Sequence, residues 1–205
     1  LCGFNFTFGK GKSGNPEILK EILEKNRIEL EVQEAVFDDN LEVISSTNIR
    51  KHIKETNLEK VKKLLGHNLI ILGKVIHGKQ LGRTIGFPTA NLKFENRVYP
   101  SFGVYGVKIY FYEKGICRTY TGVMNIGRNP TVDKDNLSVE THIFDFDKDI
   151  YGKYILIEIF KNIRKEIKFN SIDELKNQID KDSKYWKNEV KKIKEQDREN
   201  EIRWR

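Results

Sequence analysis

The chain has 205 residues, of which 38% are hydrophobic and 33% charged, enough for one ordinary domain and part of another. This composition excludes wholesale disorder, and no apolar run approaches the ~20 residues that a membrane span requires. The net charge of +7 could serve a nucleic-acid surface or anionic small molecules, but the lysines are spread widely and the densest basic cluster is interleaved with acids. We therefore expect a solvated helix face there, and no nucleic-acid or membrane partner.

The first 66 residues are predicted to form strand, helix, strand, helix and helix, which is part of an α/β layer. The first helix is indicated by Asn15, a good helix cap, and by Pro16, which suits the first helical position. Gly66 is expected to stop the last helix. The predicted elements span residues 1–8, 15–26, 28–37, 45–55 and 57–66.

After residue 66 the pattern changes to strands separated by turn signals. Antiparallel strands in succession favour a small closed barrel, because closure removes exposed sheet edges. The sequence "SIDE", with Ser171 as cap and Glu174 three residues later, is a capping box that opens a long helix with apolar Ile172, Leu175, Ile179 and Trp186 on or near one face. The predicted strands span residues 68–78, 103–112, 116–126, 138–147 and 154–163. We expect two domains, 1–66 and 67–205.

The stretch "FGKGKSGN" has the G-x-G-x-x-G spacing of a dinucleotide-binding turn, with Gly9, Gly11 and Gly14 in the three positions. That interpretation requires a complete βαβ half-sheet, and only 66 residues precede the barrel strands. A phosphate loop is excluded, because Phe6 stands five positions before Gly11, where a glycine is needed. Neither cofactor fold is favoured.

A more informative stretch is "HGKQLGRTIGFPTANL", residues 77–92. Its glycines and proline shape a loop that can approach a ligand closely, while Arg83, Thr89 and Asn91 offer a cation, a hydroxyl and an amide. A magnesium nucleotide needs such groups, since Mg²⁺ prefers oxygen ligands and phosphates need donors. Taken alone, a Gly/Pro stretch with a Thr and an Asn is more often an ordinary loop.

A candidate general base lies in "SVETHIFDFD". Strand alternation places Glu140 and His142 on one face together with Phe144 and Phe146. A partly buried carboxylate on that face would suit proton abstraction, whereas an exposed one would be an ordinary surface residue. This segment leaves both alternatives open.

Five separated blocks, "GRTIGFPTANL", "GVYGV", "TGVMNIG-RNPT", "VETHIFDFDKDIYG" and "FNSIDELKNQIDKD", closely resemble the riboflavin kinase family in order and spacing. The resemblance implies an α+β protein with a six-stranded antiparallel closed β-barrel followed by a long C-terminal helix. It also implies transfer of the γ-phosphoryl group of ATP to the terminal ribityl hydroxyl of riboflavin, which gives FMN.

The same resemblance assigns roles to residues. Glu140 is the expected catalytic base, and Thr89 and Asn91 are the expected Mg²⁺ ligands. The expected ATP- and flavin-binding residues are Arg83, Gly86, Pro88, Thr89, Asn91 and Arg164. The substrates would be riboflavin and ATP, and we expect a cytoplasmic monomer, in keeping with the two cysteines, which fit no metal or redox spacing. The alternative is a flavin- or nucleotide-binding regulatory barrel without turnover.

The segments "GFNFTFGKGKSGN" and "ISSTNIR" resemble the closing portion of the FMN adenylyltransferase domain, a partial nucleotidyltransferase (Rossmann-like) segment that precedes the kinase in bifunctional bacterial FAD synthetases. The HxGH nucleotide motif of that domain is not found in residues 1–66. We therefore expect a chain that lacks its true beginning, and adenylyl transfer only when the missing N-terminal segment is present.

Overall fold

The computed structural model describes residues 1–78, 81–94, 98–113, 115–128 and 137–203. They form two compact units, Leu1–Ile49 and Arg50–Arg205. The domain boundary expected at residues 66 and 67 lies inside the second unit, and the assignment of 1–66 and 67–205 to two functional domains stays a prediction. The last residues of the family-like block "TGVMNIG-RNPT", 129–131, lie outside the described residues.

In the first unit, β1 (Cys2–Gly3) pairs in parallel with β2 (Val32–Gln33). Both strands are far shorter than predicted, because alternation of side chains does not by itself provide a neighbour for backbone hydrogen bonds. Helix α1 (Pro16–Lys25) begins as predicted, since the backbone N–H of Ile18 donates to Asn15 Oδ1 at 2.9 Å. The cap of this helix is therefore confirmed.

The glycine-rich stretch closes on itself. Phe8 and Gly14 form an isolated antiparallel bridge around the short helix η1 (Lys10–Lys12). A Cβ at Gly14 would lie 2.5 Å from the Phe8 ring, so only glycine permits this closure. The stretch is thus a tight loop, and it does not join a strand directly to a helix as a dinucleotide-binding turn would.

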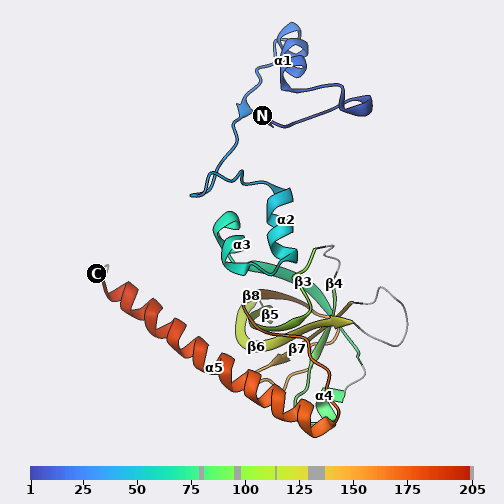
Figure 1. The fold of residues 1–205 in the computed structure, drawn as a ribbon, viewed down its shortest axis with the longest axis vertical. Coiled ribbons are helices and arrows are strands. Elements are labelled where there is room, and N and C mark those ends of the chain that lie inside the picture. The colour runs from blue at the N-terminus through green and yellow to red at the C-terminus, as the bar shows by residue number, and fades with distance from the viewer. Residues whose placement is uncertain (79–80, 95–97, 114, 129–136, 204–205) are drawn as a thin grey trace. The chain divides into compact units, whose positions relative to one another are not determined.

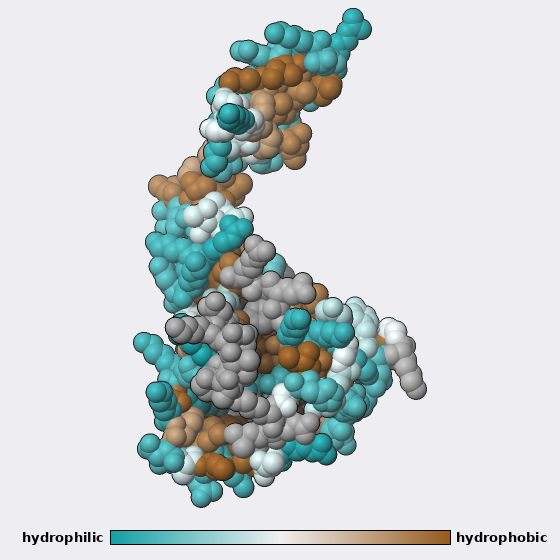
Figure 2. Space-filling view, turned by 90° about the vertical axis from the view of Figure 1, so that its right-hand side faces the viewer, coloured by the Kyte–Doolittle hydropathy of each residue, from teal (hydrophilic) through white to brown (hydrophobic). Residues whose placement is uncertain are grey.

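The first unit also leaves many apolar side chains in solvent (Figure 2). Of α1, only Pro16 is buried. Large exposed apolar residues in this unit include Phe4, Phe6, Ile18, Ile22, Ile28, Val36, Phe37 and Leu41. The core described below belongs to the second unit.

Helix α2 (Ser46–Lys54) contains the division between the units, and α3 (Leu58–Leu65) follows within the second. As predicted, α3 ends at Gly66, which adopts the left-handed conformation at φ 76°. Its apolar face is buried through Val61 and Leu64, and the helix contacts β3 and β8.

Six antiparallel strands close into a barrel in the order β3, β4, β7, β6, β5, β8 (Figure 1). The predicted six-stranded barrel is confirmed. Its strands are β3 (Leu69–Ile76), β4 (Ala90–Phe94), β5 (Gly103–Glu113), β6 (Ile116–Arg128), β7 (Leu137–Ile143) and β8 (Tyr154–Lys165).

The barrel interior is filled by the alternate residues of its strands. On β3 the buried and exposed positions alternate strictly from Ile71 to Ile76, and on β8 Ile155, Ile157 and Ile159 are at most 1% exposed. The remaining fully buried members include Val75, Tyr105, Val107, Ile109, Met124 and Ile126. This packed interior makes the barrel a rigid frame for the polar side chains on its outer face and rim.

The long helix α5 (Ile172–Arg203) runs past one side of the barrel (Figure 1). It begins as predicted, because the Glu174 N–H donates to Ser171 Oγ at 3.1 Å. Trp186 is 1% exposed, and its indole Nε1 donates to the Val107 carbonyl at 3.2 Å. Its ring lies over Gly106, where a Cβ would come within 2.3 Å of it. Of the apolar face predicted for this helix, Ile172 is 56% exposed.

One loop prediction and one strand prediction were wrong. The stretch 77–92 was predicted as a loop, but it contains the short helix α4 (Leu81–Thr84) and the start of β4. The strand predicted over 138–147 ends at Ile143, and the chain turns at Asp145 with φ 53°. Phe146 consequently leaves the face that carries Glu140 and packs edge-on against Tyr120 with ring centroids 5.0 Å apart.

Among the described residues, no helix combines the length and apolar character that crossing a membrane requires.

Candidate active site

Three neighbouring strands place polar residues in one row. In the antiparallel register, Asn91 of β4 lies opposite Glu140 of β7, and Glu140 lies opposite Asn125 of β6. Directly paired residues project to the same face of a sheet. The row therefore carries one carboxylate between two amides, and all three side chains are partly buried.

The Glu140 carboxylate is held from two sides. Thr89 Oγ1 donates to Glu140 Oε2 at 3.4 Å, a long contact, and Ser138 Oγ donates to Glu140 Oε1 at 3.1 Å. Both donors are uncharged hydroxyls, which orient the carboxylate without neutralising it. The Glu140 carboxylate thus lies beside the Thr89 hydroxyl.

Two glycines make room for these side chains. A Cβ on Gly78 would lie 2.3 Å from Asn91 Cγ, so the Asn91 amide packs directly on the Gly78 backbone. A Cβ on Gly82 would lie 2.3 Å from the Phe87 carbonyl oxygen and 3.3 Å from Thr89 Oγ1. These two glycines therefore permit close packing of the chain on itself, and the predicted close approach to a ligand stays a prediction.

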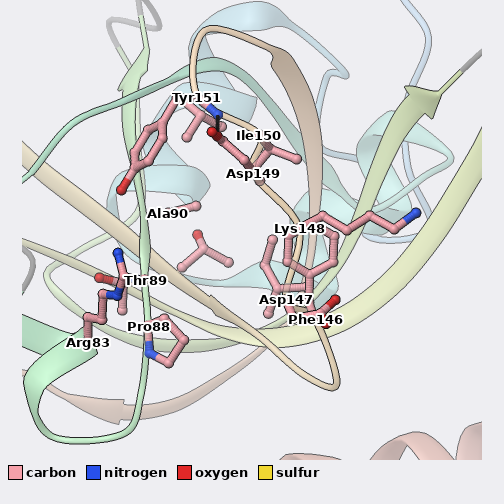
Figure 3. Close-up of a pocket in the computed structure, with 13 residues that line it drawn as sticks. Arg83, Pro88, Thr89, Ala90, Phe146, Asp147, Lys148, Asp149, Ile150 and Tyr151 are labelled. Carbon is pink, nitrogen blue, oxygen red and sulfur yellow. Dashed lines mark hydrogen bonds between the residues drawn. The ribbon is translucent and has the colours of Figure 1, made fainter.

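A cavity of about 560 Å³ opens beside Thr89. Its walls come from Val75 of β3, residues within 83–90, Thr141 and Ile143 of β7, and the loop 146–151. Figure 3 shows Arg83, Pro88 and Thr89 together at one side of it, and Phe146, Asp147 and Lys148 at another. A cavity of this size accommodates a ligand the size of a nucleotide.

Polar groups in the cavity wall differ in their availability to a ligand. The Lys148 ammonium binds the Glu113 carboxylate at 2.8 Å, and this hydrogen bond raises the pKa of Lys148. The Thr141 hydroxyl is fully buried and has no hydrogen-bond partner within the described part of the chain. A buried hydroxyl without a partner is costly, so a ligand atom that bonds to it would relieve that cost.

Aromatic rings close one wall of the cavity. The imidazole of His77, at the end of β3, stacks on the Tyr151 ring with centroids 3.7 Å apart and an interplanar angle of 23°. Tyr151 belongs to the loop between β7 and β8 and lines the cavity. The stack therefore links two loops that are distant in sequence.

The predicted site residues fall into two places. Arg83, Pro88 and Thr89 line the cavity, and Asn91 and Glu140 adjoin it through Thr89 and the β4–β7 ladder. Gly86, at φ 87°, shapes the turn that leads from α4 into this segment. The structure thus brings Thr89 and Glu140 into contact, although they lie 51 positions apart in the sequence.

Arg164 is not brought to this cavity. Its Nε and Nη2 atoms both bind Asp182 Oδ2 of α5 at 2.9 Å, and its Nη1 donates to the Lys165 carbonyl at 3.1 Å. Gln178 donates to the other Asp182 oxygen at 2.8 Å. The guanidinium therefore ties β8 to α5, and its predicted role in ligand binding stays a prediction.

Sequence reasoning singled out neither Asn125 nor Thr141 as a functional residue. Asn125 stands within the block "TGVMNIG", and its register against Glu140 is the signal that identifies it. Thr141 lies on the opposite face of β7 from Glu140, and only the structure shows that it contributes to the cavity wall.

Comparisons with known proteins relate the chain to one enzyme family. The riboflavin kinase (flavokinase) family matches residues 65–190 of the chain. A bifunctional riboflavin kinase/FMN adenylyltransferase from Haemophilus influenzae is 41% identical over 180 residues, 88% of this chain and 57% of the relative. The protein of that name from Bacillus subtilis is 40% identical over 186 residues, 89% of this chain and 57% of the relative.

A solved structure described as a macrolide-efflux protein from Streptococcus pneumoniae matches with a TM-score of 0.72 and 38% identity. The match covers 88% of this chain and 57% of that one. The chain thus spans a little more than half the length of the curated relatives that it matches.

Proposed function

Because this chain belongs to the riboflavin kinase family, we propose that it transfers the γ-phosphoryl group of ATP to the 5′-hydroxyl of the riboflavin ribityl chain, giving FMN and ADP. The observation that carries the proposal is that Thr89, which lines the cavity, donates to the Glu140 carboxylate, and that Asn91 pairs with Glu140 across β4 and β7. A phosphate-binding segment and a base are the two parts that such a transfer requires.

The proposed mechanism assigns one task to each group. Glu140 accepts the proton of the ribityl hydroxyl while the ribityl oxygen forms the new bond to the γ-phosphorus. The bond from that phosphorus to the β–γ bridging oxygen breaks, which releases ADP. Arg83, exposed at the cavity wall, compensates phosphate charge. Phosphoryl transfer depends mainly on alignment and charge compensation, which the rigid barrel supports.

The donor set fits Mg²⁺. Thr89 Oγ1 and the Asn91 amide oxygen are hard oxygen ligands beside a carboxylate, and Mg²⁺ is commonly held by one or two protein ligands together with substrate phosphates. The described residues contain no cluster of three or more His, Cys, Asp or Glu side chains that could hold a metal unaided. In this proposal Thr89 and Asn91 would hold Mg²⁺ together with the ATP phosphates, and the bound ion would supply positive charge against them.

For the whole protein we propose that the same polypeptide also converts FMN to FAD, as the names of its bifunctional relatives state for them. Residues 1–66 would then belong to the adenylyltransferase domain. A cytoplasmic monomer is proposed as well, in keeping with the free cysteines Cys2 and Cys117.

The direct test is incubation of the purified chain with riboflavin and Mg-ATP, with chromatographic detection of FMN, FAD and ADP. Stoichiometric FMN and ADP support the kinase. Tight binding of flavin or nucleotide without any FMN would instead favour a regulatory barrel. FAD in the products would place an adenylyl-transfer site within these 205 residues.

A further inference from the structure

His142 makes a contact that the proposed mechanism does not use. It lies on β7 two residues after Glu140, and its Nδ1 is 2.9 Å from the Pro88 carbonyl oxygen. A carbonyl only accepts hydrogen bonds, so Nδ1 carries the proton. Burial lowers the pKa of His142, which keeps the ring neutral. His142 is therefore a neutral donor directed at the loop that carries Thr89.

This bond lies just beyond the end of a strand ladder. The described pairing of β4 with β7 runs through Asn91 with Glu140 and Ala90 with Thr141. Continued by one step it would pair Thr89 with His142, but β4 begins at Ala90. The His142 side chain thus holds the segment just before β4, where the described pairing of β4 with β7 has ended.

The hydrogen bond from His142 also acts on the peptide unit that orients Thr89. The Pro88 carbonyl belongs to the peptide that joins Pro88 to Thr89, so its direction sets where the Thr89 side chain projects. The Thr89 hydroxyl lies 3.4 Å from Glu140 Oε2, at the outer limit of hydrogen bonding, and a small rotation would break the contact.

Two aromatic rings restrain the imidazole. Phe87 packs edge-on at 5.3 Å between centroids, and Phe144 does so at 5.7 Å. Such packing fixes the ring orientation and hence the direction of the Nδ1–H bond. It also provides a purely structural role for His142, which an experiment must separate from the hydrogen bond.

We propose that His142 is a positioning residue for phosphoryl transfer, whose Nδ1–H holds the Pro88 carbonyl so that the Thr89 hydroxyl stays beside Glu140. The inference rests on the proposed kinase function. His142 contacts the loop and not the reacting atoms, so it acts through Thr89.

Three substitutions separate the hydrogen bond from packing. His142→Asn keeps an amide donor near the Nδ1 position, His142→Gln moves that donor toward the Nε2 position, and His142→Leu keeps apolar bulk without a donor. For each variant, kcat, the KM for ATP and for riboflavin, and the thermal midpoint are measured. The dissociation constant of Mg-ADP is measured by calorimetry, which needs no turnover.

We expect His142→Leu to lower kcat/KM for ATP about tenfold, the size of one net hydrogen bond. His142→Asn should stay within about threefold of the parent, and His142→Gln should resemble His142→Leu. KM for riboflavin should stay unchanged, and Mg-ADP affinity should fall in the order parent, Asn, Leu.

Equal losses in the Asn and Leu variants would assign His142 to ring packing and overturn the proposal, as would a fully active Leu variant. If the parent itself makes no FMN, the kinase proposal fails, and the Mg-ADP series then decides the positioning role alone. An unchanged Mg-ADP affinity across all variants would in that case reject it.

Discussion

Thr89 and Glu140 are 51 residues apart in sequence, yet the hydroxyl of one donates to the carboxylate of the other. The contact exists because β4 and β7 are neighbours in the barrel although β5 and β6 separate them along the chain. Closure of the sheet therefore joins the predicted phosphate-binding residue to the predicted base, and several measurable consequences depend on this pair.

The first prediction concerns Glu140 as the base. Glu140→Gln still accepts hydrogen bonds from Thr89 and Ser138 but cannot take a full proton. We expect kcat for FMN formation to fall about 10²–10⁴-fold with little change in KM for either substrate. Glu158→Gln is the matched control, because Glu158 is also a partly buried strand carboxylate bonded by neutral groups, Tyr110 and Asn68, and does not line the cavity. Equal kcat values in the two variants would remove Glu140 from the mechanism.

The second prediction concerns the Thr89 hydroxyl. Thr89→Ala removes it, and we expect kcat/KM for Mg-ATP to fall about 10–100-fold, as for the loss of a bond to a charged group. Thr89→Ser restores a hydroxyl and should recover most of the activity. Thr119→Ala, at an exposed position of β6, should change neither quantity. Near-parental turnover by Thr89→Ala would reject its assignment to Mg-ATP.

The third prediction concerns Arg164, which the structure places in an ion pair with Asp182. Asp182 is 4% exposed, so Arg164→Ala leaves a buried carboxylate without its cation. We expect a loss of about 1.5–3 kcal/mol in the free energy of unfolding, measured by urea titration. Lys161→Ala, which breaks the more exposed pair with Glu189, should cost less.

Kinetics of the same variant distinguish the two roles of Arg164. If the guanidinium serves only to tie α5 to β8, the folded Arg164→Ala protein keeps its KM values at a temperature well below its midpoint. A large increase in KM for ATP or riboflavin in the folded variant would instead support the ligand-binding role predicted from the sequence.

The fourth prediction concerns pH. Burial lowers the pKa of His142 in the folded chain, so the unfolded chain binds more protons below the ordinary histidine pKa. This contribution to stability is present above pH ~6.5 and is lost as pH falls through the lower folded pKa. We expect His142→Asn to lose less stability than the parent between pH 7.5 and pH 5 in urea titrations. Parallel pH profiles would contradict the assignment of a partly buried, neutral ring.

The sequence predicts the barrel well, because inward and outward residues alternate along most of its strands. The strand at residues 68–78 shows this, since its buried positions from Ile71 to Val75 follow strict alternation. Strand β4 was missed because Gly86 and Pro88 lie directly before it and mark the whole stretch as a loop. Only the paired neighbours of "ANLKF" reveal a strand.

The site is predictable in its residues but not in its geometry. Resemblance to a family identified Thr89, Asn91 and Glu140, but their meeting depends on the strand order, which no local pattern encodes. Asn125 illustrates the limit, since its position opposite Glu140 follows from the β6–β7 register alone. Arg164 illustrates the converse, because its partner Asp182 lies on a helix whose docking the sequence does not specify.

The indole of Trp186, buried over Gly106, makes the docking of α5 visible by optical means. The chain has two tryptophans, and Trp204→Phe leaves Trp186 as the sole indole emitter. Because its ring is 1% exposed, separation of the helix from the barrel would transfer it to water and shift its fluorescence to longer wavelength. Stopped-flow recording of that shift during refolding would time the arrival of the helix separately from closure of the barrel, without any label attached to the protein.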